Sequence, residues 1–339
     1  MSKEKMKLGR IALNNNLILA PMQNISTAPY RRFCRKVSDN VGLVIVPMLY
    51  TKRLEQNPSS VELELYMIEE ERPIGVQLIG SSIDALKKAI EFLESYEFDL
   101  IDLNAGCPSK RAIKAKEGGY LMNDLETLRQ LIQTALKFSS RPVSLKVRTG
   151  FEKPVEIDEF ISLIDNLGLE FITIHGRMVK DRFNDAKIDL DTIRKIKKNL
   201  SIPVIGNGDL VDHDSAKYFL EHTNVDGLMI GRGSIGNPEI FNQIDKFLKN
   251  DTEISIENDI IKWQNHIKLY EECIDDFLDE NNPIKYQKEL FKFTELYRNS
   301  IWLTKNIKDS TSIRRRISKA KNLNQLKCIF KEVIQFYNS

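Results

Sequence analysis

One cysteine is set apart from the other three by its neighbours in the chain. Cys107 follows Gly106, which tolerates backbone angles that other residues avoid, and it precedes Pro108, which favours an extended conformation of the cysteine. Such a loop presents a thiol for chemistry, as a nucleophile or as an acid. The other cysteines fall in expected helices among apolar neighbours, where cysteine acts as a small hydrophobic residue: Cys34, Cys273 and Cys328.

Polar and glycine-rich segments come directly after a series of short apolar runs. At the carboxyl ends of parallel strands in a barrel, such segments converge on one face, where active sites are built. We therefore expect them to form one site. In chain order they are Pro21-Met22-Gln23, Pro47-Met48, Gln77, Asn104 to Pro108, Lys146 with Arg148, His175 with Arg177, Asn207-Gly208-Asp209 and Gly231-Arg232-Gly233.

The last two segments indicate a phosphate site. Their glycines leave backbone N–H groups free to bind a phosphate, Arg232 supplies charge, and Asn237 followed by Pro238 predicts a helix N-terminus directed at the same group. Residues 231–236 also match GxGxxG, but no strand is expected after them, which argues against a dinucleotide fold.

Three further side chains would reach the heterocycle of a mononucleotide such as flavin: Gln77, Lys146 and His175. Taken singly, each has an ordinary structural role as well. Gln77 would cap a loop, Lys146 would form a salt bridge, and His175 would be a hydrogen-bonded core histidine.

The elements that must position these residues are predicted by periodicity. Amphipathic helical stretches, including 83–96, 124–138, 155–167 and 191–200, separate the apolar runs, which predicts a (β/α)₈ TIM barrel. A doubly wound sheet also alternates strands and helices, but it would not gather all of the polar segments. The eight runs are 17–20, 43–46, 75–79, 100–103, 143–147, 171–174, 203–205 and 226–230.

After Phe241 only helical periodicity remains, at 259–277, 283–297 and 323–336. We predict a barrel domain over 1–242 and a smaller all-helical domain over 243–339. Residues 285–339 hold 13 basic and 4 acidic residues, a net charge of +9, whereas the other 284 residues carry 37 and 44, a net charge of −7. A basic segment on an acidic body indicates a polyanion-binding module, or else an ordinary solvated helix face.

Composition excludes other classes of protein. No apolar stretch approaches the roughly 20 residues that cross a bilayer, and residues 1–10 lack the features of a signal peptide, so we expect a cytoplasmic protein. The four histidines are not spaced as metal ligands, and no metal site is expected. Monomer is the default expectation.

The order of the motifs resembles that of the tRNA-dihydrouridine synthase family over about residues 10–245. The matching segments are LILAPMQNISTAPYRRFC, GVQLIGS, IDLNAGCPSK, SLKVRTGF, TIHGR, IPVIGNGD and DGLMIGRGSIGNPEIF. The resemblance implies an oxidoreductase, a flavoprotein that uses NADPH to reduce the C5=C6 bond of a D-loop uridine in tRNA.

The resemblance also implies residue roles. Cys107 would give the proton to uracil C5, and Asn104, Arg148 and Arg177 would lie near the uracil. We expect Lys110 and Arg111 to face tRNA phosphate, because their charges close to the sulfur would favour the thiolate, the wrong form for an acid. FMN would be bound by Pro21, Met22, Gln23, Gln77, Lys146, His175, Asn207, Gly208, Asp209, Gly231 and Arg232.

The basic C-terminal segment would bind the tRNA backbone. Its cations are Lys305, Lys308, Arg314, Arg315, Arg316, Lys319 and Lys321, and three aromatic residues would stack on bases or pack in a core: Tyr286, Tyr297 and Trp302.

Departures from the family pattern occur around the site and leave the target uridine open: Ser26-Thr27, Pro47, Met178 and Glu239. Two rival functions remain. One is a flavin barrel enzyme for a free pyrimidine, such as a dihydroorotate dehydrogenase, against which the basic segment argues. The other is a tRNA-binding protein without turnover, against which the joint presence of Cys107, Lys146, His175 and Arg232 argues.

Overall fold

The computed structural model describes residues 6–182, 187–249, 259–280, 287–305 and 307–338. Internal contacts divide the chain into two compact units. One contains residues up to 27 together with 40–232, and the other contains 28–39 together with 233 onward. The domain boundary at residue 242 stays a prediction. Tyr286 and the start of the helix expected at 283–297 lie outside the described residues.

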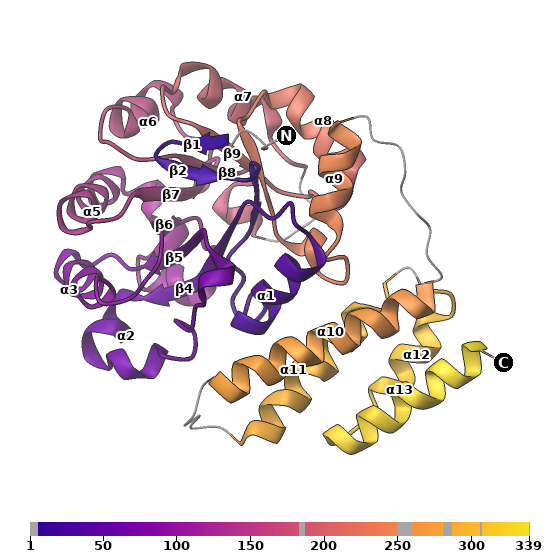
Figure 1. Cartoon of the computed structure of the whole chain (residues 1–339). Coiled ribbons are helices and arrows are strands. Elements are labelled where there is room, and N and C mark those ends of the chain that lie inside the picture. Colours follow the sequence, from indigo (N-terminus) through magenta and orange to yellow (C-terminus); the bar gives the residue numbers. More distant parts are fainter. Residues whose placement is uncertain (1–5, 183–186, 250–258, 281–286, 306, 339) are drawn as a thin grey trace. The chain divides into compact units, whose positions relative to one another are not determined.

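The first unit contains a closed barrel of eight parallel strands, in which β10 pairs with both β9 and β3 (Figure 1). All eight apolar runs form these strands, which confirms the TIM barrel and excludes the open sheet. The strands are β3 (Leu17–Leu19), β4 (Leu43–Tyr50), β5 (Ile74–Ile79), β6 (Leu100–Ala105), β7 (Val143–Arg148), β8 (Ile172–His175), β9 (Val204–Asn207) and β10 (Gly227–Ile230).

Strand β4 is longer than its apolar run indicates. Pro47 and Met48 lie inside the strand, not after it, and the pairing with β5 shifts register between Val46 and Leu49. Proline has no N–H to donate to a ladder, so a register shift at Pro47 lets the strand continue. The strand therefore delivers Tyr50 to the carboxyl end of the barrel.

Helices alternate with the strands in this unit. The four amphipathic stretches form helices α3, α5, α6 and α7, and side-chain caps fix three of their starts: Ser82, Asp124 and Asp189 accept from backbone N–H groups three residues on. The helices are α2 (Thr51–Gln56), α3 (Ile83–Leu93), α4 (Lys110–Lys114), α5 (Leu125–Phe138), α6 (Ile157–Ile164), α7 (Leu190–Asn199) and α8 (His213–Thr223).

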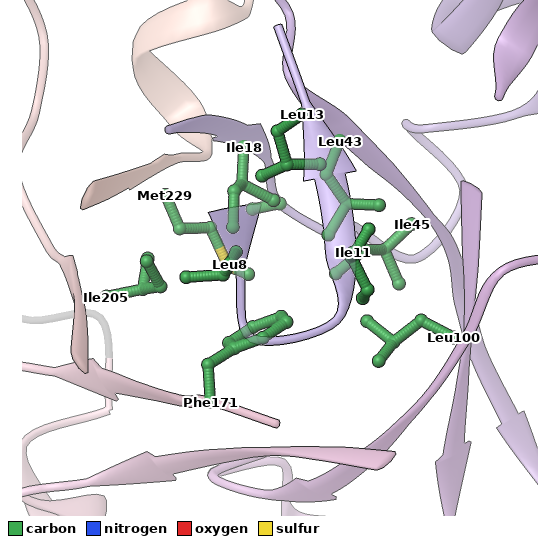
Figure 2. Packing of buried hydrophobic residues seen from close by; sticks show 11 residues of the cluster. Leu8, Ile11, Leu13, Ile18, Leu43, Ile45, Leu100, Phe171, Ile205 and Met229 are labelled. Carbon is green, nitrogen blue, oxygen red and sulfur yellow. The ribbon is translucent and has the colours of Figure 1, made fainter. Parts of the chain in front are cut away.

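A hairpin absent from the sequence prediction closes the amino end of the barrel. Strands β1 (Met6–Leu8) and β2 (Ile11–Leu13) pair antiparallel, and Gly9 takes a positive φ at the turn. Figure 2 shows hairpin side chains packed with residues from the starts of the barrel strands. The buried cluster is Leu8, Ile11, Leu13, Ile18, Ala20, Leu43, Ile45, Leu100, Phe171, Ile205 and Met229.

Truncating Phe171, which is fully buried in this cluster, should lower the free energy of unfolding by about 3–5 kcal/mol, because the cavity left behind adds to the lost burial. Urea unfolding of Phe171→Ala measures the loss. Tyr218→Ala, at a 54% exposed aromatic residue of α8, is the control and should cost less than about 0.5 kcal/mol. Equal losses in the two variants would show that the cluster does not stabilise the barrel.

The second unit is helical and has its own aromatic core. Tyr270 packs edge-on against Phe33, Trp263 packs against Phe330, and Cys34 and Cys273 are buried as expected. Its helices are α1 (Ala28–Val37), α9 (Ile240–Leu248), α10 (Asp259–Glu280), α11 (Lys288–Trp302), α12 (Ser310–Ile317) and α13 (Leu323–Asn338).

Two local expectations in this unit are wrong. Cys328 is exposed, because it lies on the outer side of α13. Asn237 does not cap a helix: α9 begins at Ile240, and the Asn237 amide donates to Gln243 Oε1 over 2.9 Å. Among the residues described, no helix combines the length and hydropathy needed to cross a membrane.

Candidate active site

The predicted polar residues at the carboxyl ends of the strands are linked by hydrogen bonds. Gln77 on β5, Asn104 on β6, Lys146 on β7 and Asn207 on β9 all have a bonded partner on another strand. The parallel register brings them to one level, since Asn104 pairs with Lys146 and His175 pairs with Asn207. The structure therefore brings these residues together at the carboxyl end of the barrel.

A chain of amide hydrogen bonds runs from the barrel interior to the cysteine loop. Gln77 Nε2 donates to Asp102 Oδ2 over 2.6 Å, and Asn104 Nδ2 donates to Gln77 Oε1 over 2.8 Å. Asn104 Oδ1 then accepts from the backbone N–H groups of Gly106 and Cys107, over 3.1 and 2.9 Å. The position of the Cys107 backbone is thus set by side chains of two strands.

Asp102 determines which atoms donate and which accept along this chain of hydrogen bonds. It was not identified as a site residue from the sequence. The residue is fully buried, and its other oxygen accepts from Ser144 Oγ over 2.6 Å. Burial raises the pKa of the carboxyl, while the hydrogen bonds and the nearby Lys146 oppose that rise. A carboxylate only accepts, so Gln77 must direct its NH₂ to Asp102 and its carbonyl to Asn104. The available signal was an acid inside the apolar run Leu100–Leu103.

The cysteine loop is also held from its outer side. Arg148 donates to the carbonyl oxygens of Gly106 and Met178, over 2.9 and 3.0 Å. The N–H of Gly119 donates to the Cys107 carbonyl over 2.9 Å, and a Cβ at Gly119 would lie only 2.8 Å from that oxygen. Only glycine permits this approach. The Cys107 side chain remains partly exposed.

Among the described residues, Lys146 has no carboxylate partner, and one ring nitrogen of His175 has no hydrogen-bond partner. Lys146 Nζ donates to Asn207 Oδ1 over 3.0 Å, and no carboxylate in the described residues forms a salt bridge with it. Burial and Arg148 lower its pKa to about 8. Burial, then Lys146 and three arginines, hold the pKa of His175 well below its usual range. His175 Nδ1 is buried and has no hydrogen-bond partner in the described part of the chain.

Asp209 joins two arginines at the ends of β8 and β10. Arg177 binds the carboxylate with both nitrogens, over 2.8 and 2.5 Å, and Arg232 Nη2 lies 3.1 Å from Oδ1. The Arg177 hydrogen bond lowers the pKa of Asp209, which stays charged. Gly208 adopts φ +126°, and the group keeps a net positive charge next to glycine backbone. Such a group would attract a phosphate.

The remaining predicted residues are less involved in the structure. Met22 is half-buried and receives a hydrogen bond from the N–H of Ile25, Pro21 is half-buried, and Gln23 is exposed. Lys110 and Arg111 begin α4 directly after the cysteine loop, and Arg111 lies over the Tyr50 ring at 4.1 Å from the centroid. The described residues contain no group of three His, Cys, Asp or Glu side chains arranged to hold a metal ion.

These features fit an anionic heterocyclic cofactor. The unpartnered His175 nitrogen and the Lys146 ammonium offer polar contacts to a ring, and the cations around His175 favour negative charge. A Cβ at Gly231 would meet only Ala20 and Met22 side chains, at 3.5 and 3.7 Å, so the backbone there is accessible. The residues expected to bind FMN are therefore compatible with it.

The lowered pKa of Lys146 predicts a pH dependence of stability in protein without added flavin. Below about pH 8 the ammonium is protonated in both states, so its burial penalty is fully present. Between that pH and the ordinary lysine value only the unfolded chain holds the proton, so the free energy of unfolding rises by at most about 1.4 kcal/mol per pH unit.

Lys146→Met should remove this rise and should stabilise the protein most at the lower pH. Urea unfolding at about pH 7.5 and pH 9.5 measures both effects. Lys198→Met, at an exposed lysine of α7, is the control and should keep the wild-type difference between the two pH values. If Lys146→Met kept the wild-type difference in unfolding free energy between the two pH values, Lys146 would not be the group responsible for it.

A closed parallel barrel, with a presented thiol and a cationic polar site at the carboxyl ends of its strands, defines a TIM-barrel enzyme. The sequence model of the dihydrouridine synthase (Dus) family matches residues 18–335. The chain belongs to this family.

Individual relatives agree with this assignment. The chain is 34% identical over 248 residues to tRNA-dihydrouridine synthase B of Pasteurella multocida, which covers 73% of this chain and 74% of the relative. It is 32% identical over 251 residues to a probable tRNA-dihydrouridine synthase of Rickettsia conorii, covering 74% and 75%.

Two solved structures share the fold. The 6-hydroxypseudooxynicotine amine oxidase of Pseudomonas geniculata matches with a TM-score of 0.56 at 13% identity over 76% of this chain, which spans about half (51%) of that protein. The old yellow enzyme homologue of Zymomonas mobilis matches with a TM-score of 0.52 at 14% identity, covering 75% of this chain and 94% of that one. At these identities the likeness concerns the fold alone.

Proposed function

We infer that this protein is a cytoplasmic tRNA-dihydrouridine synthase, which uses FMN and NADPH to reduce the C5=C6 bond of a D-loop uridine in tRNA. The observation that carries the proposal is the cysteine loop. Asn104 and Arg148 hold the backbone on both sides of a partly exposed thiol, at the same end of the barrel as His175 and Lys146. Family membership supports the same reaction.

The residues at the strand ends would hold FMN. Lys146 and His175 would bind the ring system, and Gln77 has a second amide hydrogen left after its bond to Asp102. Arg232 and the backbone at Gly208 and Gly231 would bind the phosphate. When bound, the flavin would supply the hydride that reaches C6 of the uracil.

Cys107 would complete the reduction by giving its proton to C5 of the uracil, as a general acid. The thiol must therefore be neutral before the step and becomes a thiolate after it. Arg111 lies over Tyr50 and is occupied by that ring contact. Arg148 binds the loop through backbone oxygens, so it positions the thiol through its backbone.

The helical unit would bind the tRNA backbone. Lys305, Lys308, Arg314, Arg315, Lys319 and Lys321 are exposed, whereas Arg316 pairs with Glu332. Trp302 and Tyr297 are half-buried and contact Arg298 and Phe293, which favours packing over base stacking for both. Because a stacked uridine does not reach the barrel interior, the target base must flip out of the tRNA.

The test is mass analysis of unmodified tRNA after incubation with the protein and NADPH. The proposal expects a gain of two hydrogens at one uridine, and flavin released on denaturation as FMN. Reduction of free uracil or orotate without reduction of tRNA would favour the free-pyrimidine rival. A colourless protein that takes up no flavin would refute the enzyme assignment.

A further inference from the structure

A second recess lies beside the cysteine loop and outside the residues assigned to the flavin. Its volume is about 510 Å³, and its walls come from the end of β4, from α2, from the 3-10 turn Pro58–Val61 and from α4. We call it the Tyr50 cleft. It is lined by Tyr50, Lys52, Arg53, Gln56, Asn57, Ser60, Arg111, Ala115 and Glu117.

The Tyr50 cleft adjoins Cys107 through the chain segment that follows the cysteine. Arg111 lies four residues after the cysteine on the helix that the loop leads into, and Glu117 precedes the two glycines that pack on Cys107. The pKa of Tyr50 is raised by burial first and by the nearby Cys107 second, which agrees with this proximity. A molecule in the cleft would thus lie next to a substrate held at the thiol.

The cleft offers two cations to a ligand. Lys52 and Arg111 are exposed, and neither forms a salt bridge within the described residues. Arg53 is different, because Glu64 pairs with it over 2.7 Å and Ser60 accepts from it over 2.9 Å. The guanidinium carbon of Arg111 lies over the Tyr50 ring, at 4.1 Å from its centroid, and this pair gives the cleft a surface on which a base could stack.

One carboxylate in the wall narrows the choice of ligand. Glu117 is only 4% exposed, and no described residue donates a hydrogen bond to its side chain. Burial raises its pKa, and Lys52 and Arg111 counteract this effect. A buried carboxylate without a hydrogen-bond donor is costly, so a ligand group that donates to it, such as a ribose 2′-hydroxyl, is favoured. A phosphate at the same position would be repelled.

We propose that the Tyr50 cleft binds the ribonucleotide adjacent to the target uridine of the RNA. Its base stacks on the Arg111–Tyr50 pair, Lys52 binds its phosphate, and Glu117 accepts from its 2′-hydroxyl. The alternative occupant, the adenosine end of NADPH, carries a phosphate on the 2′-oxygen and would meet Glu117 unfavourably. The identity of the RNA as tRNA rests on the proposed function. The existence of a ribonucleotide site in the cleft does not.

Binding of unmodified tRNA to the full-length flavin-loaded protein tests the cations. Arg111→Ala should weaken binding about tenfold through lost stacking, and Lys52→Ala should lower the slope of log affinity against log salt by about one. Lys114→Ala, at an exposed lysine of the same helix outside the cleft, is the matched control and should change affinity much less. Equal effects of Arg111→Ala and Lys114→Ala would overturn the proposal.

The ribose contact is tested with single 2′-deoxy substitutions on each side of the reduced uridine, once mass analysis has located it. Wild-type protein should lose several-fold affinity for one of the two RNAs, and Glu117→Met, whose side chain has no oxygen acceptor, should lose this discrimination. If cleft variants raise KM for NADPH and leave tRNA binding intact, the cleft binds the reductant and the proposal fails.

A protein that binds tRNA through the cleft yet forms no dihydrouridine would refute the proposed function alone. In that case the pair of deoxy substitutions is placed on the two sides of each D-loop uridine in turn. Loss of affinity at one of these positions in wild type, absent in Glu117→Met, would still support the cleft assignment, and uniform affinity would overturn it.

Discussion

Cys107→Ala will slow dihydrouridine formation by about 10²–10⁴-fold, the usual contribution of a positioned general acid. The alanine removes the proposed proton donor, and the backbone contacts of residue 107 with Asn104 and Gly119 remain available. Flavin content should therefore be unchanged. The rate is measured as the two-hydrogen mass gain of tRNA in single turnover, with flavin absorbance recorded on the same sample.

Cys328→Ala provides the control for this experiment. It removes the exposed thiol on α13 and should keep full activity. If Cys107→Ala retained wild-type rate, the proton would have to come from another group, and the assignment of Cys107 as the acid would be wrong.

Asp102→Asn will lower kcat by about 10²-fold with a much smaller change in KM for tRNA, because Asp102 positions the cysteine loop without touching the substrate. An asparagine both donates and accepts, so the orientation of the Gln77 amide is no longer fixed. If Gln77 turns, Asn104 loses its acceptor, and the N–H groups of Gly106 and Cys107 lose theirs.

A pH profile separates this positioning role from a general loss of stability. The pKa of Asp102 is raised by burial, so protonation of its carboxyl at acidic pH should reproduce the effect of the amide in wild type. The acid limb of kcat should then be absent from Asp102→Asn. Asp99→Asn is the matched control: Asp99 pairs with Arg72 just before β6, at the opposite end of the strand, and its loss should affect stability but not kcat. If the acid limb of kcat were unchanged in Asp102→Asn, Asp102 would not have the proposed positioning role.

The barrel was predictable because its strands are buried on both faces and so form short, mostly apolar runs between helices. The hairpin that closes the amino end of the barrel was not predictable from the sequence. Its strands are three residues each, and exposed polar residues such as Arg10 interrupt the apolar pattern, so only packing against Phe171 and its neighbours reveals it. The start of α9 was misplaced because Asn237 and Pro238 form a turn that precedes the helix.

The candidate site was predictable where it depends on strand ends and not where it depends on pairing between side chains. Gln77, Lys146, His175 and Asn207 meet because parallel strands end at one level. Arg177 and Asp209, which form a bidentate ion pair, lie 32 residues apart in the chain and meet only through loop geometry. A local sequence pattern therefore does not predict this pair. Asp102 lies within a strand, where an isolated acid carries no periodic signal.

The amide chain from Asp102 through Gln77 to Asn104 also constrains how this sequence can evolve. Each member is satisfied only while its neighbour keeps the same orientation, so a first substitution leaves a buried donor or acceptor unpaired. Substitutions at the three positions should therefore be strongly epistatic, with double variants costing less than the sum of the single ones. Descendants of this protein would have to cross a low-fitness intermediate to change any one of the three, so the positions should be inherited as a block.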